Sequence, residues 1–499
     1  MQVGETAKQV KTVVVDRSQM KWEVLDLETL IGPDHAARAI WNVCGHFDLS
    51  RFEAGRKTRK GEAGRPCWPA RLLVSIWVYS YTQGIASARA IARMVKYEPG
   101  LRWLVANQEI NAHTLSDFRV GHGEALREVF AQFLTLLEAA GLVDLSTLLQ
   151  DGTKIRAVAG KASMHRRKTL EKRLGQARKL VKKMEREAEA GDGEGADAKR
   201  EAAQRRAAGE ALERAKSALA RLKELEQAAK AKDRGEIRVS ETEPEARKMK
   251  QTDGGWAPSY NVQVTTEAAS RMIVAVGVTT AANDTQELVP ALEAVEATVG
   301  TLPKQMIADN GYATRANVEA ASERGVELVA PWKDELSRAA GACKRNGIDV
   351  EFGVGSFRLA KDGQTMTCPA GKTLVQIGER KHHGVERRKF VAREEDCAGC
   401  AWKARCCGNK GAPRQVEQVV ESEPMRAYLA RMKRPEVRQL YKRRCEVAEF
   451  PHLWAKGVKG WRRFSVRGLV KAGMEALWVA LAYNVVQWMR VRSEQRLAA

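Results

Sequence analysis

The chain has 499 residues, enough for two to four domains with hydrophobic cores. Its formal net charge of +22 predicts a polyanionic partner, most commonly nucleic acid, although an ordinary basic protein would show the same excess. The sequence contains no run of about 18 apolar residues and no signal peptide, so it predicts neither a membrane span nor secretion.

The first part of the chain has a helical pattern. Residues 1–22 are predicted to be a flexible lead and residues 23–141 a helical domain. Ser87 precedes one apolar helical stretch, and Thr114 is the predicted N-cap of another that carries Arg119. Short helices with interspersed arginines suggest a DNA-binding module with Arg119 as a DNA contact, although a plain helical bundle would give the same pattern.

Beyond residue 142 the pattern alternates between strands and helices. Short apolar or alternating runs at 143–150, 260–264 and 272–278 predict strands, and a helix is expected at about 285–299. This alternation predicts an α/β domain with a mixed sheet over residues 142–499.

A charged segment at 165–232 interrupts this domain. Its apolar residues repeat in steps of three and four along two stretches, which a Gly-rich segment at 191–195 separates. The pattern predicts an antiparallel helical hairpin. Such a hairpin is either an arm that contacts DNA or a partner subunit, or a solvated insertion with a thin apolar seam.

Three acidic residues are candidate metal ligands. Asp151 and Asp309 each follow an apolar run and precede a Gly, which predicts a carboxylate at the C-terminal tip of a buried strand, although Asp-Gly is also a common turn signal. Glu449 lies in a helical pattern. Carboxylates that converge repel one another unless a cation lies between them, so the sequence predicts a divalent-metal site that acts on phosphodiesters.

The predicted helix around Glu449 also carries possible phosphate contacts. At 100° per residue its relevant side chains fall within an arc of about 140°: Tyr441, Arg444, Glu449 and Lys456. Pro451 is expected to kink or restart this helix, so Lys456 is not fixed on the same face. Glu446 is a rival to Glu449 as the metal ligand.

The cysteines predict a second metal site. Nine cysteines without a secretion signal indicate a reducing compartment such as the cytoplasm, where clustered thiols favour metal over disulfides. A CxxC motif and two nearby cysteines suit structural Zn²⁺: Cys368, Cys397, Cys400 and Cys406. Cys407, His382 and His383 are possible substitutes, and reduced thiols without metal are the alternative.

Several motifs together resemble those of a DDE transposase of a bacterial insertion sequence. They are the helical stretch 72–119, Asp151-Gly-Thr-Lys154, the stretch 240–248, Ala308-Asp-Asn-Gly-Tyr312, Cys368-Pro-Ala-Gly371 with the CxxC motif, and the C-terminal stretches 463–469 and 482–484.

This resemblance implies an RNase H-like mixed-sheet core, an all-α N-terminal domain and a small zinc-ribbon-like insertion at 335–430. It also implies two Mg²⁺ or Mn²⁺ ions per site, held by Asp151, Asp309 and Glu449. The implied partners are double-stranded DNA, at terminal inverted repeats and at the target, and a second copy of the chain. The chain departs from the family pattern around Glu449, where Ala448 stands in place of a β-branched residue and Phe450-Pro451-His452 stands in place of Phe-Gly.

Two classes of function follow. The first is a transposase that cleaves and joins DNA strands at inverted repeats. The second is a catalytically inactive, repurposed DNA-binding protein, which would have no need of the three acids. A nuclease that cleaves without joining ends is a third possibility.

Overall fold

The computed structural model describes residues 18, 20, 24–54, 66–190, 196–332, 341–382, 385–409 and 411–498. The predicted lead at 1–22, apart from residues 18 and 20, lies outside the described residues, and so does the predicted turn at 191–195.

Seven helices form the N-terminal region: α1 (Ala36–Cys44), α2 (Ser50–Glu53), α3 (Ala70–Thr82), α4 (Ala88–Met94), α5 (Pro99–Leu104), α6 (Ala112–Gly121) and α7 (Gly123–Ala139). Almost every residue of α3 is buried, so this helix forms the centre of the group. Ser87, which precedes a predicted helical stretch, caps α4, because its side chain accepts a hydrogen bond from the Ala90 amide. The predicted cap at Thr114 is wrong: Asn111 caps α6, two residues before the His113 amide that it binds.

The central sheet is mixed, which confirms the predicted α/β class. Its strands are β1 (Thr147–Arg156), β4 (Arg247–Lys250), β5 (Trp256–Glu267), β6 (Ile273–Thr279), β7 (Gln305–Ala308) and β8 (Glu327–Val329), in the order β4-β5-β1-β7-β8, with β6 also paired to β5. β5 runs antiparallel to β1 and β6, whereas β7 runs parallel to β1 and β8.

Strand β1 is longer than the sequence indicated. Its parallel ladder with β7 ends at Gln150, but its antiparallel ladder with β5 continues to Arg156. Asp151 therefore does not end the strand. It is the first residue beyond the β1–β7 ladder, and it still pairs with Val264 on β5.

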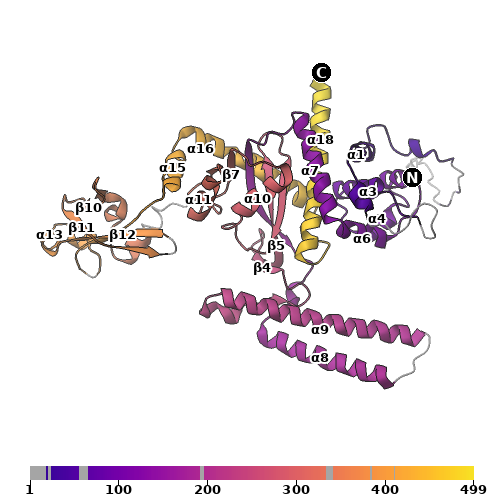
Figure 1. Ribbon diagram of the computed structural model, residues 1–499, viewed down its shortest axis with the longest axis horizontal. Coiled ribbons are helices and arrows are strands. Elements are labelled where there is room, and N and C mark those ends of the chain that lie inside the picture. The colour runs from indigo at the N-terminus through magenta and orange to yellow at the C-terminus, as the bar shows by residue number, and fades with distance from the viewer. Residues whose placement is uncertain are drawn as a thin grey trace, which may run out of the picture.

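Helices cover the sheet. α10 (Leu288–Val299) and α18 (Leu469–Ala498) both contact β6, and α18 also contacts α3 and α7 (Figure 1). The Asn484 side chain of α18 accepts from the Ile273 amide at 2.8 Å and donates to the Ile273 carbonyl at 2.7 Å, which fixes α18 on β6. By length and composition alone α18 is apolar enough to cross a membrane, but 67% of its apolar window is buried inside the molecule. We therefore interpret α18 as a core helix.

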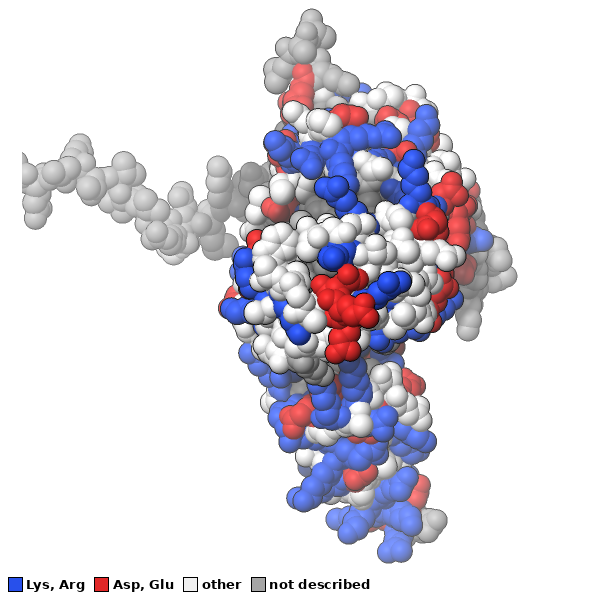
Figure 2. Space-filling model, turned by 90° about the vertical axis from the view of Figure 1, so that its left-hand side faces the viewer, with Lys and Arg blue, Asp and Glu red and all other residues white. Residues whose placement is uncertain are grey.

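A helical hairpin extends from one end of the sheet. It consists of α8 (Arg167–Ala190) and α9 (Ala196–Ala228), and the short strands β2 (Met164–His165) and β3 (Val239–Ser240) pair at its root. Figure 1 shows the hairpin below the central sheet, and Figure 2 shows Lys and Arg over much of that lower part of the molecule.

A second sheet lies on the side away from the N-terminal helices (Figure 1). Its strands are β9 (Arg358–Leu359), β10 (Thr365–Thr367), β11 (Thr373–His382), β12 (Val385–Ala392) and β13 (Gln415–Val419), and the short helices α13 (Glu394–Ala398) and α14 (Lys403–Cys406) follow β12. The chain then returns to the central sheet through α15 (Glu423–Arg431), α16 (Pro435–Lys442) and α17 (Arg444–Leu453), and α11 (Arg315–Glu323) contacts α15.

Candidate active site

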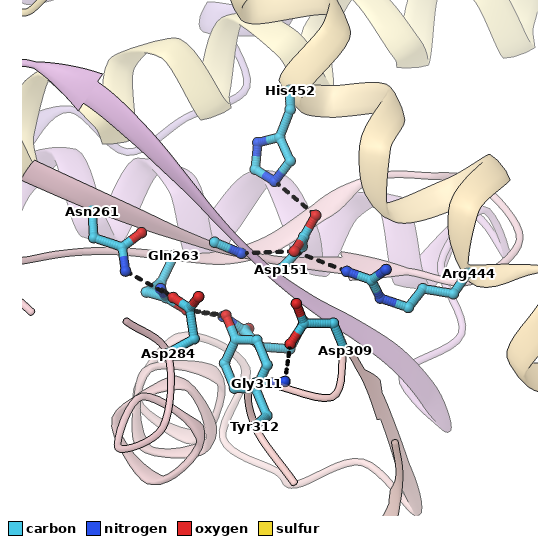
Figure 3. A network of polar contacts seen from close by, with 11 residues as sticks. Asp151, Asn261, Gln263, Asp284, Asp309, Gly311, Tyr312, Arg444 and His452 are labelled. Carbon is cyan, nitrogen blue, oxygen red and sulfur yellow. Dashed lines mark hydrogen bonds and ion pairs between the residues drawn. The ribbon is translucent and has the colours of Figure 1, made fainter. Parts of the chain in front are cut away.

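Two of the predicted acids lie on neighbouring strands of the central sheet. Gln150 and Ala308 are partners in the β1–β7 ladder, so Asp151 and Asp309 follow at the same level (Figure 3). The Gly152 amide donates to Asp151 Oδ1 at 3.0 Å, and the Gly311 amide donates to Asp309 Oδ1 at 2.6 Å. The sheet therefore brings together the first two predicted acids.

The glycine after each aspartate has a steric reason. A Cβ atom on Gly152 would lie 2.5 Å from Asp284 Oδ1, and one on Gly311 would lie 2.8 Å from Asp309 Oδ1. At either distance the carboxylate would have to move to make room for a side chain. The Asp151-Gly152 pair thus lies within a strand, and its glycine allows a third carboxylate to approach.

Asp284 is this third carboxylate, and sequence reasoning missed it. It lies in the loop between β6 and α10 and accepts from Asn261 Nδ2 and Gln263 Nε2, each at 2.7 Å. Both donors belong to β5 and lie within the strand predicted at 260–264. The only sequence signal was an aspartate in the loop after a predicted strand.

The three aspartates share a partly buried environment. Burial is the main reason why the pKa of Asp151 is raised to about 6, and the charges of Asp309 and Asp284 raise it further, whereas Arg444 lowers it. Burial also raises the pKa of the Tyr312 hydroxyl, and all three aspartates add to this effect. Like charges on neighbouring strands are unfavourable without a cation, so the pair Asp151 and Asp309 suits a bound metal ion.

Two side chains of α17 contact Asp151. Arg444 donates to Asp151 Oδ1 at 2.9 Å, and His452 Nε2 lies 3.5 Å from Asp151 Oδ2 (Figure 3). Burial, followed by the charges of Lys456 and Arg444, lowers the pKa of His452 to about 3, so its imidazole is neutral near pH 7. Among the described residues, His452 Nε2 is buried and makes no hydrogen bond, which is uncommon for a buried polar atom.

The third predicted acid is not part of this cluster. Glu449 and Glu446 are exposed on α17, and the buried residues of that helix include Arg444, Val447 and Ala448. Within the described ranges, no three His, Cys, Asp or Glu side chains lie close enough to hold one metal ion. α17 runs through Pro451, and a π-helical turn at Trp454–Val458 follows it.

A cleft of about 830 Å³ adjoins these residues. Both glutamates line it, and so do cations from β1, from the π-helical turn and from the segment after it: Lys154, Arg156, Lys456 and Arg462. Asp151 raises the pKa of Lys456, whereas burial, the larger effect, lowers it. Burial is the main reason why the pKa of Tyr441 is raised, and the charge of Asp309 raises it further. Arg444 therefore contacts Asp151 directly, and Tyr441 and Lys456 lie near enough to the paired aspartates to interact with their charges.

Arg119 does not belong to any exposed surface, so the prediction that it contacts DNA is wrong. Its side chain is buried, with only 6% of the residue exposed. One guanidinium nitrogen donates to the Ala86 carbonyl at 2.6 Å and to Ser465 Oγ at 2.7 Å, and the guanidinium lies 4.7 Å from the Trp77 ring centre. Arg119 therefore joins α6 to the C-terminal part of the chain.

Five cysteines line one small cavity beside the second sheet: Cys368, Cys397, Cys400, Cys406 and Cys407. The Lys372 amide donates to Cys368 Sγ at 3.3 Å. Burial raises the pKa of Cys406, and three neighbouring thiols raise it further. Of the suggested substitutes, Cys407 lies in this group, whereas His383 and the side chain of His382 lie outside the described residues.

Comparison with known proteins gives two family matches. A family described as a transposase DDE domain matches residues 367–489, and one described as a transposase domain (DUF772) matches residues 25–121. Searches among curated proteins and among solved structures find no match. Both matched families are transposase families, and the described sheet is compatible with the RNase H-like core that a DDE domain implies. These two matches, in separate regions of the chain, support a DDE transposase of an insertion sequence.

Proposed function

We propose that this transposase catalyses metal-dependent cleavage and strand transfer at the terminal inverted repeats of its element. The observation that supports this most strongly is the pair Asp151 and Asp309, which end the β1–β7 ladder beside a cleft lined with cations. Paired carboxylates suit divalent metal, and lysines and arginines suit the DNA backbone.

Asp151 and Asp309 would hold two Mg²⁺ or Mn²⁺ ions, which fit here because clustered carboxylates lie beside an orphaned buried nitrogen of His452. Such ions supply activation of the attacking oxygen and stabilisation of the leaving oxygen. Arg444, Tyr441 and Lys456 would orient the phosphate at the element's end. Water would attack one phosphodiester and release a 3′-hydroxyl, which would then attack a phosphodiester of the target and displace its 3′-oxygen.

Glu449 remains the proposed third acid, with Glu446 as its rival. Glu449 lies about 60° from His452 around α17, so a modest turn of this helix would bring it toward Asp151. In the described conformation Arg444 and His452 contact Asp151 instead. We propose that binding of metal and DNA exchanges these contacts.

The same observation favours the alternative function. An inactive, repurposed DNA-binding protein could keep Asp151 permanently paired with Arg444 and leave Glu449 exposed. In both functions the helical region 23–141 and the basic surface would bind double-stranded DNA in the bacterial cytoplasm. Strand transfer joins two ends, so the active form is proposed to be a homodimer.

The test of the function is cleavage of DNA that carries the ends of the element. The full chain is incubated with end DNA and with a scrambled duplex, in Mg²⁺ and in EDTA. Strand cleavage and joined products on end DNA in Mg²⁺ alone are expected. Binding without cleavage in either Mg²⁺ or Mn²⁺ would support the inactive alternative, and cleavage without joining would indicate a nuclease.

Metal affinity is predicted to fall in acid. The Asp151 carboxyl has its pKa raised to about 6, so below that pH a proton must be displaced before metal binds. The affinity of the full chain for Mn²⁺ should be constant above pH 7.5 and about tenfold weaker at pH 5. Titration calorimetry at these pH values measures this, and a midpoint near pH 4 would contradict the shared environment of Asp151.

We further propose one structural Zn²⁺ per chain, bound by Cys368, Cys397, Cys400 and Cys406. The shared cavity and the amide bonded to Cys368 Sγ support this, although binding requires the thiols to draw closer. Reduced thiols without metal are the alternative, and Cys407 is the available substitute.

Elemental analysis of the purified chain is expected to give about one zinc per chain. The double variant Cys397→Ser/Cys400→Ser should lose it, with faster hydrogen exchange at residues 360–409, because metal binding stabilises the local fold. Cys445→Ser, at an exposed cysteine of α17, is the control and should keep the metal. A zinc-free wild type prepared without chelator would refute the site.

A further inference from the structure

The outer face of α8 carries a row of cations. We define the α8 basic stripe as five exposed side chains: Lys168, Lys172, Lys179, Lys182 and Arg186. At 100° per residue they fall within an arc of about 80° that contains no acidic residue. The buried residues Leu170 and Ala177, which form the seam of the hairpin with α9, lie on the opposite side of the helix.

These charges are not used within the hairpin. At its root, Arg167 pairs with Glu226 and Arg173 pairs with Glu241, so the other cations of α8 there hold the hairpin to its base. In the part of the chain that the structure describes, no stripe side chain forms an ion pair. The stripe is therefore free to bind an external anion.

Helix α9 differs in this respect. α8 has nine lysines and arginines against four glutamates, whereas α9 has eight against six acidic residues. Three cations of α9 pair along their own helix: Arg214 with Glu210, Lys216 with Glu213 and Arg221 with Glu224. The excess charge of the hairpin thus lies mainly on α8.

The stripe matches the charge pattern of a nucleic-acid duplex. It spans about 27 Å along the helix, a length over which duplex DNA presents a charge every 1.7 Å or so. It contains no aromatic or aliphatic side chain, which a protein hot spot or a lipid-binding helix would need. The stripe therefore suits a polyanion with regularly spaced charges.

In the sequence, the stripe follows shortly after residues that line the cleft. β1 carries Asp151 and ends at Arg156, which lines the cleft, and α8 begins at Arg167. Figure 1 shows the hairpin directly below the end of the sheet that carries β4 and β5. DNA that leaves the cleft on this side would meet the hairpin.

We propose that the α8 basic stripe binds the phosphate backbone of duplex DNA that extends beyond the cleft, without regard to sequence. This inference rests on the proposed function for its choice of DNA as the polyanion. The hairpin would lengthen the stretch of DNA that the protein contacts, and other parts of the protein would recognise the repeat sequence.

The test changes all five stripe residues to Gln in the full chain. The matched control changes five exposed cations of α9 to Gln, chosen because they spread over an arc of about 220° and not about 80°: Arg200, Arg205, Arg206, Lys216 and Lys223. Binding to a random-sequence fluorescent duplex is measured by anisotropy at several salt concentrations. The slope of log affinity against log salt should fall by about 4 in the stripe variant and by less than about 1 in the control.

Circular dichroism checks that both variants keep their helices. We expect this result because every changed side chain is exposed. An unchanged slope and affinity in the stripe variant would overturn the inference. So would normal DNA binding combined with loss of self-association in sedimentation, which would identify the stripe as a protein interface. Failure of the proposed function would give a different result. If the wild-type chain cleaved no end DNA in Mg²⁺, catalysis would be refuted. If the stripe variant still lost salt-dependent binding, this inference would remain intact.

Discussion

Asp151→Asn and Asp309→Asn should each reduce cleavage of end DNA by at least about 10³-fold while leaving DNA affinity nearly unchanged. Each change removes the negative charge that would hold a divalent ion but keeps the volume of the side chain. Both side chains are partly buried beyond the end of the β1–β7 ladder and are not among the exposed cations. Their substitution should therefore not disturb DNA binding.

The measurement is single-turnover cleavage in Mg²⁺, with binding measured in parallel by anisotropy. Glu449→Gln and Glu446→Gln form a matched pair, because both are exposed glutamates on the same helix and line the same cleft. Glu449→Gln should be inactive and Glu446→Gln active. The reverse result would assign the third acid to Glu446. If Asp284→Asn were inactive and both glutamate variants active, the third acid would be Asp284. Substantial cleavage by Asp151→Asn would reject the metal site.

Local sequence patterns predicted several strands of the central sheet, but neither β4 nor the length of β1. Strands at 260–264 and 272–278 lie within or overlap β5 and β6, and the run before Asp309 is β7. Asp151 was expected to end its strand because Gly follows it. Strand length is set by the partner instead: β5 continues beside β1 as far as Ser259, opposite Arg156.

The sequence predicted the site residues that follow directly on strands. It did not predict the contacts between residues that are far apart in the chain. Two acids that each follow an apolar run were expected to lie together, and β1 and β7 bring them together. Asp284 joins them through side chains of β5, which no local pattern records. Arg119 looked like an exposed helix cation, but its partner Ser465 is 346 residues away in the chain.

Replacement of this buried arginine should have the largest effect on stability. Arg119 bonds to Ser465 Oγ, which donates to Glu475 Oε2 at 2.9 Å, and Trp461 Nε1 donates to Glu475 Oε1 at 3.1 Å. Glu475 is only 1% exposed, and Arg119 is the charge that favours its ionised form. Arg119→Met leaves this carboxylate without a countercharge, which should cost about 3–5 kcal/mol. The apparent Tm should fall by roughly 5–10 °C.

Thermal unfolding followed by circular dichroism tests this, with Arg93→Met as the control because Arg93 is exposed on the neighbouring helix α4. The double variant Arg119→Met/Glu475→Gln should recover part of the loss, since it removes the uncompensated charge. Burial raises the pKa of Glu475, so its ionised form disfavours the folded state and the deficit of Arg119→Met should shrink as the pH falls. Equal Tm values for Arg119→Met and Arg93→Met, together with a loss of DNA affinity specific to Arg119→Met, would restore Arg119 as a DNA contact and refute the buried network as its role.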